Sequence, residues 1–108
     1  MVYVRGNPFD FERWQEEGAS GWGYPEVLPY FRRAETRDAG GDAYRGDRGP
    51  LQTRYGSLAN PLHAAWLAAG QEAGYPLTDD INGHQQEGFG RFDMTVGRGQ
   101  RCSAAVAY

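Results

Sequence analysis

The sequence predicts an α+β fold made of short helices with a few short strands. Three observations support this class: two Asn-Pro pairs that suit helix starts, short segments in which apolar and polar residues alternate, and frequent turn-forming residues. The chain has 108 residues, of which 16 are Gly and 6 are Pro. This length allows one domain at most. We therefore expect residues 1–108 to form a single partial domain with a modest core.

Three helices are predicted, over residues 7–18, 24–35 and 60–74. The first and third begin at an Asn-Pro pair, in which Asn is a preferred N-cap and Pro suits the first helical position. The first and third end at a Gly, which adopts the left-handed C-terminal conformation. Pro29 removes one backbone hydrogen bond from the second helix. Gly70 weakens the third by ~1 kcal/mol relative to Ala.

Two strands and a final helix are expected from the remaining patterns. Residues 51–55 and 91–96 alternate in polarity, as short strands do. The Gly-rich residues 97–99 form a tight turn between the second strand and a last helix that begins near Arg101. Ser103 is the expected N-cap of that helix.

Residues 36–49 are charged, rich in Gly and without periodicity, which indicates a loop. Their apolar residues are Ala39, Ala43 and Tyr44. Such a stretch buries little surface to offset the cost of ordering, so residues 37–49 are expected to be mobile. The three Trp residues, in contrast, are expected in the core: Trp14, Trp22 and Trp66.

Charge and composition exclude several classes of protein. The net charge is -3, and all 11 basic residues are Arg, so nothing favours binding to nucleic acid or an anionic membrane. The chain has no apolar run long enough to span a membrane and no signal-peptide pattern. A single Cys excludes an internal disulfide. A cytoplasmic location is the default expectation.

The segment 79–83, Asp-Asp-Ile-Asn-Gly, has oxygen ligands ahead of a glycine, as an EF-hand calcium loop does. The pattern fails at the twelfth position, where Gly90 stands in place of Glu. We therefore predict no metal site, and an Asx-type turn in which the carboxylates accept hydrogen bonds from the loop.

Neither histidine has a Ser, a Cys or a pair of carboxylates at a sequence spacing that would indicate a catalytic site. His63 falls in the third predicted helix and His84 in a loop. We expect both to be structural or solvated and predict no catalytic residue in this chain. Cys102, between an Arg and a Ser, is expected to be a small, half-buried residue rather than a reactive thiol.

Six segments in order carry a family resemblance: MVYVRG, DFERW, GW-x-YPEVLPYFRRAE, NPLHAAW, TDDINGHQQEGFG and RCSAAVAY. Together they resemble the FAD-dependent glucose-methanol-choline oxidoreductases, and in particular the choline-dehydrogenase-like members. The resemblance covers essentially the whole chain. Both ends look internal, because an apolar run stands at residues 2–4 without a preceding turn and an Ala-rich run stops at Tyr108. The chain is thus expected to be an internal segment of a longer flavoenzyme, an incomplete part of its FAD and substrate domains.

The resemblance implies a cofactor contact at the start of the chain. The second half of the family signature is matched by Tyr3, Gly6 and Glu12. Met1 and Val2 fall where the family's backbone passes along the flavin, so they are the predicted FAD-binding residues. A flavin needs main-chain N–H donors at its polar edge and apolar cover elsewhere.

The resemblance also implies a small-molecule alcohol as the substrate, choline or a related compound, oxidised to the aldehyde by hydride transfer to the flavin. Four side chains are candidates to line or support the substrate cavity: Gln85, Gln86, Phe89 and Phe92. The family's catalytic His lies downstream of the matched region. Its GxGxxG motif, which binds the dinucleotide pyrophosphate, is absent from this chain. The chain alone is therefore expected to be inactive and to bind FAD weakly.

A second hypothesis is that the chain is a binding protein rather than part of an enzyme. The chain would then be a free-standing, catalytically inactive binding or interaction module descended from such an enzyme. Its ends would expose apolar surface, through which the chain could self-associate.

Overall fold

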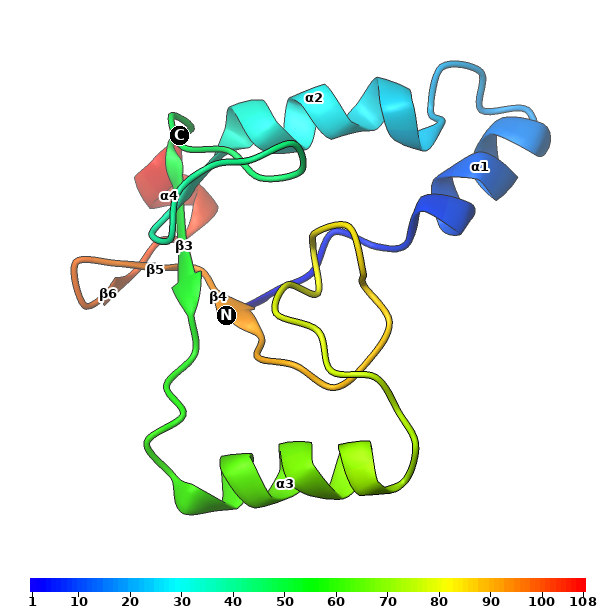
Figure 1. Cartoon of the computed structure of the whole chain (residues 1–108). Helices are drawn as coiled ribbons and strands as arrows, with labels where there is room; N and C mark the ends of the chain where they lie inside the picture. Colours follow the sequence, from blue (N-terminus) through cyan, green and yellow to red (C-terminus); the bar gives the residue numbers. More distant parts are fainter.

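The structure, a computed structural model, describes all of residues 1–108. It has four helices, α1 (Pro8–Glu16), α2 (Tyr24–Ala34), α3 (Pro61–Glu72) and α4 (Ala104–Ala107), and six short strands, β1 (Val2–Tyr3), β2 (Glu35–Arg37), β3 (Leu51–Tyr55), β4 (Asp93–Met94), β5 (Val96–Gly97) and β6 (Gln100–Arg101). Helices α1 and α2 lie at one end of the molecule and α3 at the other, with strands and loops between them (Figure 1). The predicted α+β class is confirmed. None of the four helices has the length and apolar character that a membrane span needs.

Four of the strands form one sheet in the order β1-β4-β3-β2. Strands β2 and β3 are parallel, whereas β4 is antiparallel to both β3 and β1. Met94 of β4 lies opposite Val2 on one side and Arg54 on the other. The sheet therefore brings the start, the middle and the last part of the chain together, and β1 is one of its edges.

The predicted strand 91–96 is wrong as a single element, because it is split at Thr95. The Thr95 N–H donates to the Met1 carbonyl at 2.8 Å, and the Thr95 carbonyl accepts from the Cys102 N–H at 3.0 Å. The backbone thus leaves the sheet after β4 and enters a second, two-stranded sheet formed by β5 and β6.

The predicted turn after this strand is confirmed, but the last helix begins later than expected. Arg98 and Gly99 have φ values of 51° and 76°, which matches a two-residue hairpin loop. Arg101 lies in β6 rather than at the start of a helix. Helix α4 begins at Ala104, with Ser103 as its N-cap residue but without a side-chain cap hydrogen bond.

The predicted helix starts are confirmed by their caps. Asn7 Oδ1 accepts a hydrogen bond from the Phe9 N–H at 3.0 Å, and the Asp10 carboxylate accepts one from the Asn7 N–H at 3.4 Å. Asn60 Oδ1 accepts from the Leu62 N–H at 3.0 Å. Side-chain oxygens therefore satisfy backbone donors that the first helical turn leaves free.

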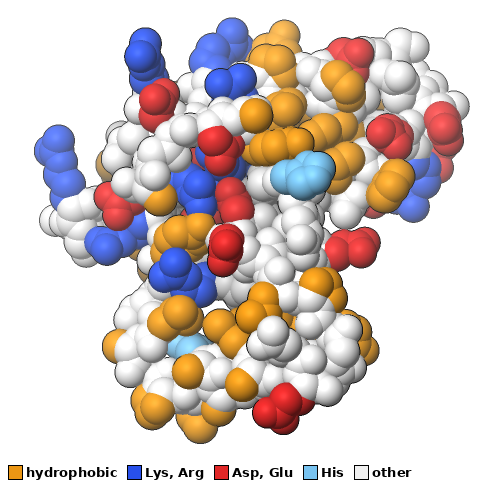
Figure 2. All heavy atoms as spheres, in the orientation of Figure 1, with side chains coloured by type: hydrophobic (Ala, Val, Ile, Leu, Met, Phe, Trp, Pro, Cys, Tyr) orange, Lys and Arg blue, Asp and Glu red, His pale blue; other side chains and the backbone are white.

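The core of the molecule is polar rather than apolar. Only three hydrophobic side chains are buried, Phe11, Tyr24 and Cys102, whereas seven polar or charged residues are. The predicted core position of the Trp residues is wrong: Trp14, Trp22 and Trp66 are 44%, 54% and 66% exposed. Hydrophobic side chains lie on the surface over both ends of the molecule (Figure 2). No element of the chain covers these side chains, so the large apolar residues do not form a core.

The predicted loop at 36–49 needs a correction. Thr36 and Arg37 belong to β2, and Arg45 is completely buried. Ion pairs rather than apolar contacts hold Arg45 in place, and they are not visible in the composition of the loop. Residues 38–50 contain no helix and no strand of the two sheets. Their mobility stays a prediction.

Candidate functional site

A buried ion pair between Glu35 and Arg45 lies at the centre of the fold. Arg45 Nη2 donates to Glu35 Oε1 at 2.6 Å and Arg45 Nε donates to Glu35 Oε2 at 3.0 Å, and both side chains are fully excluded from solvent. Arg5 also pairs with this carboxylate, and the Thr53 hydroxyl donates to it. Burial alone would raise the pKa of Glu35, but the hydrogen bonds from Arg45 and Thr53 hold that pKa below its usual range.

Arg45 extends this pair into a network that joins distant loops. Its Nη1 lies 2.9 Å from Asp93 Oδ2 and 2.5 Å from Asp80 Oδ1. Asp80 is also 3.5 Å from Arg37. The ion network thus contains three Arg and three acidic side chains: Arg5, Arg37, Arg45, Glu35, Asp80 and Asp93. Opposite charges are balanced, which is the condition for burying them.

The segment 79–83 forms the predicted turn, and its side chains face this network. Asp80 Oδ1 accepts from the Asn82 N–H at 2.9 Å, as in an Asx-turn. Asn82 is fully buried and contacts the N-terminal strand. No group of three or more His, Cys, Asp or Glu side chains is arranged to hold a metal ion. No local sequence pattern indicates that this turn contacts Arg45 and residues 3–5.

Strand β1 presents a free main-chain edge. The Met1 carbonyl accepts from the Thr95 N–H at 2.8 Å, so the next opposed pair, Val2 and Met94, is the non-hydrogen-bonded pair of the antiparallel ladder. The Val2 N–H and carbonyl therefore point away from β4, to the outer edge of the sheet. Met1 and Val2 are each 54% exposed.

Two cavities adjoin this N-terminal strand, and Phe92 lines both. The first, here called the Val2 cavity, has a volume of about 450 Å³ and includes Val2, Trp66 and Met94 in its lining. The second, the Gln86 cavity, has a volume of about 310 Å³ and includes Val4 and Gln86. Gln86 Nε2 is buried without a hydrogen-bond partner. Apolar side chains and one unsatisfied amide donor are therefore among the groups that line the cavities at Val2 and Val4.

The structure separates the four candidates for a substrate cavity. Gln86 and Phe92 line cavities beside Val4 and Val2, and that substrate binds in either cavity stays a prediction. Gln85 instead donates from its side chain to two carbonyls within its own loop. The Phe89 ring packs against Trp66, with ring centroids 5.4 Å apart, and against Gly70. Gln85 thus supports its own loop, and Phe89 packs against α3; neither lines one of these two cavities.

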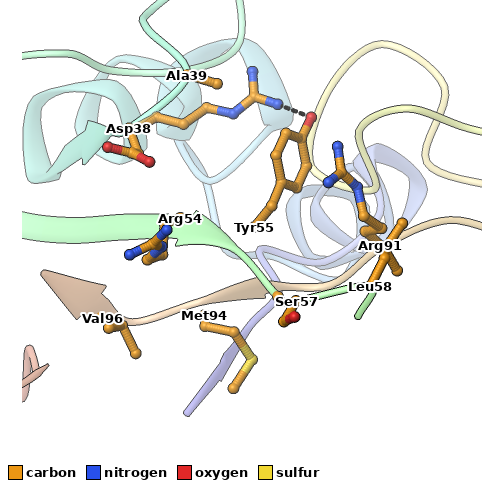
Figure 3. A pocket seen from close by; sticks show the side chains of 11 residues that line it. Asp38, Ala39, Arg54, Tyr55, Ser57, Leu58, Arg91, Met94 and Val96 are labelled. Atoms are coloured by element: carbon orange, nitrogen blue, oxygen red, sulfur yellow. Dashed lines mark hydrogen bonds between the residues drawn. The ribbon is translucent and has the colours of Figure 1, made fainter. Parts of the chain in front are cut away.

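A third cavity, of about 650 Å³, was not expected from the sequence (Figure 3). The Tyr55 ring lies between two guanidinium groups, whose carbons are 4.9 Å (Arg37) and 4.0 Å (Arg91) from its centroid. Tyr55 accepts a hydrogen bond from Arg37. Three Arg side chains, Arg37, Arg54 and Arg91, and one carboxylate, that of Asp38, line this cavity, so its field favours anionic groups.

The two histidines and the cysteine have different neighbours. His84 Nδ1 lies 3.0 Å from the Tyr44 hydroxyl. His63 lines the Val2 cavity, with no hydrogen bond to another side chain. Cys102 is buried, and its Sγ lies 3.3 Å from the Gln52 N–H. It is thus a packing residue, more buried than predicted.

Gly6 is required by the backbone. Its φ is +92°, a conformation that side chains rarely adopt, and an added Cβ would lie 3.4 Å from the Phe11 ring. The small residue of the signature therefore has a structural reason of its own in this chain, at the entry to α1.

Known proteins resemble this chain in sequence and in fold. The family model described as GMC oxidoreductase matches residues 1–108. Human mitochondrial choline dehydrogenase is 57% identical over 108 residues, which cover 100% of this chain and 18% of that protein. The structure of pyridoxine 4-oxidase from Mesorbium loti superposes with a TM-score of 0.90 at 34% identity, covering 100% of this chain and 22% of the other. An FAD-dependent oxidoreductase from Chaetomium thermophilum matches 82% of this chain and 17% of its own, with a TM-score of 0.73 and 30% identity.

This chain thus spans about a fifth of the length of the proteins that it matches. The match nevertheless runs from the first residue to the last and joins sequence similarity to a shared fold. The chain belongs to the GMC oxidoreductase family.

Proposed function

We propose that this chain is the flavin-covering segment of an FAD-dependent oxidoreductase that acts on the CH–OH group of a small alcohol, choline or a related compound. The choline dehydrogenase relative, at 57% identity, supports this substrate class. The similarity to an FAD-dependent oxidoreductase structure supports the cofactor. Residues 1–108 are then a single partial domain of the longer parent protein.

The outer edge of β1 is the observation that carries this proposal. Val2 offers an N–H donor and a carbonyl that the sheet does not use. The neighbouring Val2 cavity adds apolar side chains, Trp66, Phe92 and Met94. A flavin needs this combination of main-chain donors and apolar cover, so the residues present fit the group.

In this proposal the segment binds and covers the cofactor rather than moving protons. Main-chain atoms of Met1 and Val2 would contact the polar edge of the flavin, and Phe92 would exclude water beside it. Bound FAD supplies the chemistry of accepting a hydride from the alcohol carbon. The hydroxyl proton needs a general base, and we place that base outside this chain, since neither His has a partner that would activate it.

The Val2 N–H can be removed selectively in the full-length parent. Val2→Pro deletes the donor, and Pro is tolerated in an edge strand whose N–H faces outward. Val2→Ala keeps the donor and removes only side-chain atoms. We expect the Pro variant to bind FAD at least about tenfold more weakly, the loss of one buried hydrogen bond, and the Ala variant to bind nearly normally. A Val2→Pro protein with a full flavin content and an unchanged flavin spectrum would contradict the proposal.

The isolated chain provides the test of the alternative. We propose that it binds FAD weakly and has no turnover by itself, because it has no phosphate-binding glycine motif. Titrating the isolated chain with FAD tests this directly. Stoichiometric binding would favour the free-standing module, with a different mode of flavin binding. The cytoplasmic location stays a proposal, since the name of the human relative places that protein in mitochondria.

A further inference from the structure

The side-chain amide of Asn82 is fully buried and uses both of its ends. Its Oδ1 accepts from the Arg5 N–H at 2.9 Å. Its Nδ2 donates to the Tyr3 carbonyl at 3.1 Å and to Asp93 Oδ2 at 3.1 Å. Asn82 is 0% exposed. The only contacts between the turn 79–83 and the N-terminal strand that have hydrogen-bond geometry run through this amide.

These bonds continue the sheet beyond its last paired residue. Tyr3 lies opposite Asp93, where β4 begins. Tyr3 and Arg5 are two positions apart, so they face the same edge of an extended strand. Asn82 therefore takes the place of one more partner residue along β1. Asn82 forms hydrogen bonds with the edge of the N-terminal strand that faces β4. The Val2 N–H points to the opposite edge, which has no partner strand.

The chemistry of the site requires an amide and excludes a carboxylate. Both atoms that receive the Nδ2 hydrogens are acceptors, the Tyr3 carbonyl and the Asp93 carboxylate. An Asp at position 82 has no hydrogens to donate there, and would add a negative charge beside Asp93 and Asp80. The substitution has nearly the same shape, so it changes hydrogen bonding and charge without changing volume.

We propose that Asn82 is a positioning residue that holds the backbone of residues 1–5 in the register in which Val2 contacts the flavin. The inference rests on the proposed function of the Val2 edge. Asn82 does not touch the cofactor in this proposal. It acts through its two hydrogen bonds to the backbone of Tyr3 and Arg5.

The experiment uses Asn82→Asp in the full-length parent, with Asn60→Asp as the matched control. Asn60 uses only its Oδ1, as an acceptor in a helix cap, and Asp performs that role equally well. Apoprotein of each variant is titrated with FAD, and the absorption spectrum of the bound flavin is recorded at saturation. We expect the FAD Kd of Asn82→Asp to rise by at least about tenfold and its flavin bands to shift, while Asn60→Asp stays within about twofold of the unaltered protein.

A second variant covers the case in which Asn82→Asp does not fold. Asn82→Ala removes the same bonds without adding a charge and leaves room for water beside the Tyr3 carbonyl and the Arg5 N–H. It should raise the FAD Kd and shift the flavin spectrum in the same direction. An Asn82→Ala protein that melts earlier but binds FAD with unchanged Kd and spectrum would overturn the inference, because Asn82 would then serve only stability.

Comparison with Val2→Pro separates this inference from the proposed function. Weaker FAD binding in both Val2→Pro and Asn82→Asp supports both. Weaker binding in Val2→Pro alone overturns the role of Asn82 and leaves the flavin contact intact. Weaker binding in Asn82→Asp alone overturns both the flavin contact of Val2 and the positioning role of Asn82, because Asn82 would then not act through Val2. Unchanged binding in both variants also overturns both proposals.

Discussion

Arg45 meets Glu35 through two parallel hydrogen bonds, 2.6 and 3.0 Å long, and neither side chain is exposed to solvent. The two residues are ten positions apart: Glu35 is the first residue of β2, and Arg45 lies within the loop 38–50. Such a bidentate pair is both strong and directional. It fixes where the loop 38–50 returns to the sheet, and Arg45 then connects it to Asp80 and Asp93.

The stability of the fold should therefore fall in acid. Hydrogen bonds from Arg45 and Thr53 outweigh burial and lower the pKa of Glu35. A carboxyl with a lowered folded-state pKa contributes its full stability above the unfolded value of about 4.3 and loses it as the pH falls through the folded pKa. Urea unfolding at pH 7 and below pH 4 should show this loss. In Glu35→Gln we expect a stability lower by about 3–5 kcal/mol at pH 7 and a weaker dependence on pH; an unchanged pH dependence would show that other carboxyls cause it.

Gly70 should not be replaceable by Ala, although Ala is the better helix former. An added Cβ would lie 2.5 Å from the Phe89 ring, so we expect Gly70→Ala to destabilise the fold by about 1–3 kcal/mol. In a Phe89→Ala background the ring is gone, and the same change should stabilise by ~1 kcal/mol. A double-mutant cycle by thermal unfolding measures the reversal. The same sign in both backgrounds would contradict the packing.

The isolated chain should bind a hydrophobic dye and unfold without a sharp transition. Leu62, Trp66 and Phe92 are 71%, 66% and 54% exposed, and exposed apolar patches above a few hundred Å² mark missing partners. Dye fluorescence and a thermal melt measure this, with Trp66→Gln as a variant expected to bind less dye. Cooperative unfolding at a high midpoint without dye binding would count against the prediction.

Trypsin should cut the loop first, at Arg48. The Arg48 side chain is 93% exposed, whereas Arg45 is fully buried, and Arg13 and Arg32 lie in helices. Limited proteolysis with mass analysis of the first fragments identifies the site. Early cleavage after Arg13 with an intact loop would show that α1 opens more readily than residues 38–50.

Replacing either histidine in the parent should leave turnover within roughly tenfold, which is about 1.4 kcal/mol in the barrier. His84 contacts Tyr44 and His63 has no polar side-chain partner, whereas loss of a general base typically costs about 10²–10⁴-fold. Turnover per bound flavin in His63→Ala and His84→Ala measures the effect. A thousandfold slower reduction of a fully loaded His84→Ala protein would place the chemistry in this segment.

The sequence was sufficient for features that depend on neighbouring residues. The helix starts at Asn7-Pro8 and Asn60-Pro61 follow from capping within three residues. The hairpin turn at 98–99 follows from its glycines. The class of the protein followed from the order of the six segments, and the family match confirms it.

Other features depend on residues far apart in the chain, and no local pattern reveals them. Arg5 and Asn82 are 77 positions apart, and Arg45 and Asp93 are 48 apart. A charged residue in a Gly-rich loop is usually solvated, so Arg45 gave no sign of burial. The sequence predicts a core position for Trp66, which is 66% exposed, because periodicity shows which face of a helix is apolar but not what covers that face. Whether Met1 and Val2 contact FAD stays a prediction.

The ion network also has a consequence for synthesis of the chain. Its members are spread from Arg5 to Asp93, so none of the local segments contains a complete set of partners. Contacts between such distant residues form slowly, because the intervening loops must close first. A nascent chain that emerges from the ribosome can form its helices in turn and can pair Glu35 with Arg45, which are ten positions apart, but Arg45 has no contact with Asp93 until Asp93 has been translated. We therefore expect the complete network to form late, once the beginning of the segment and residues near its end can meet.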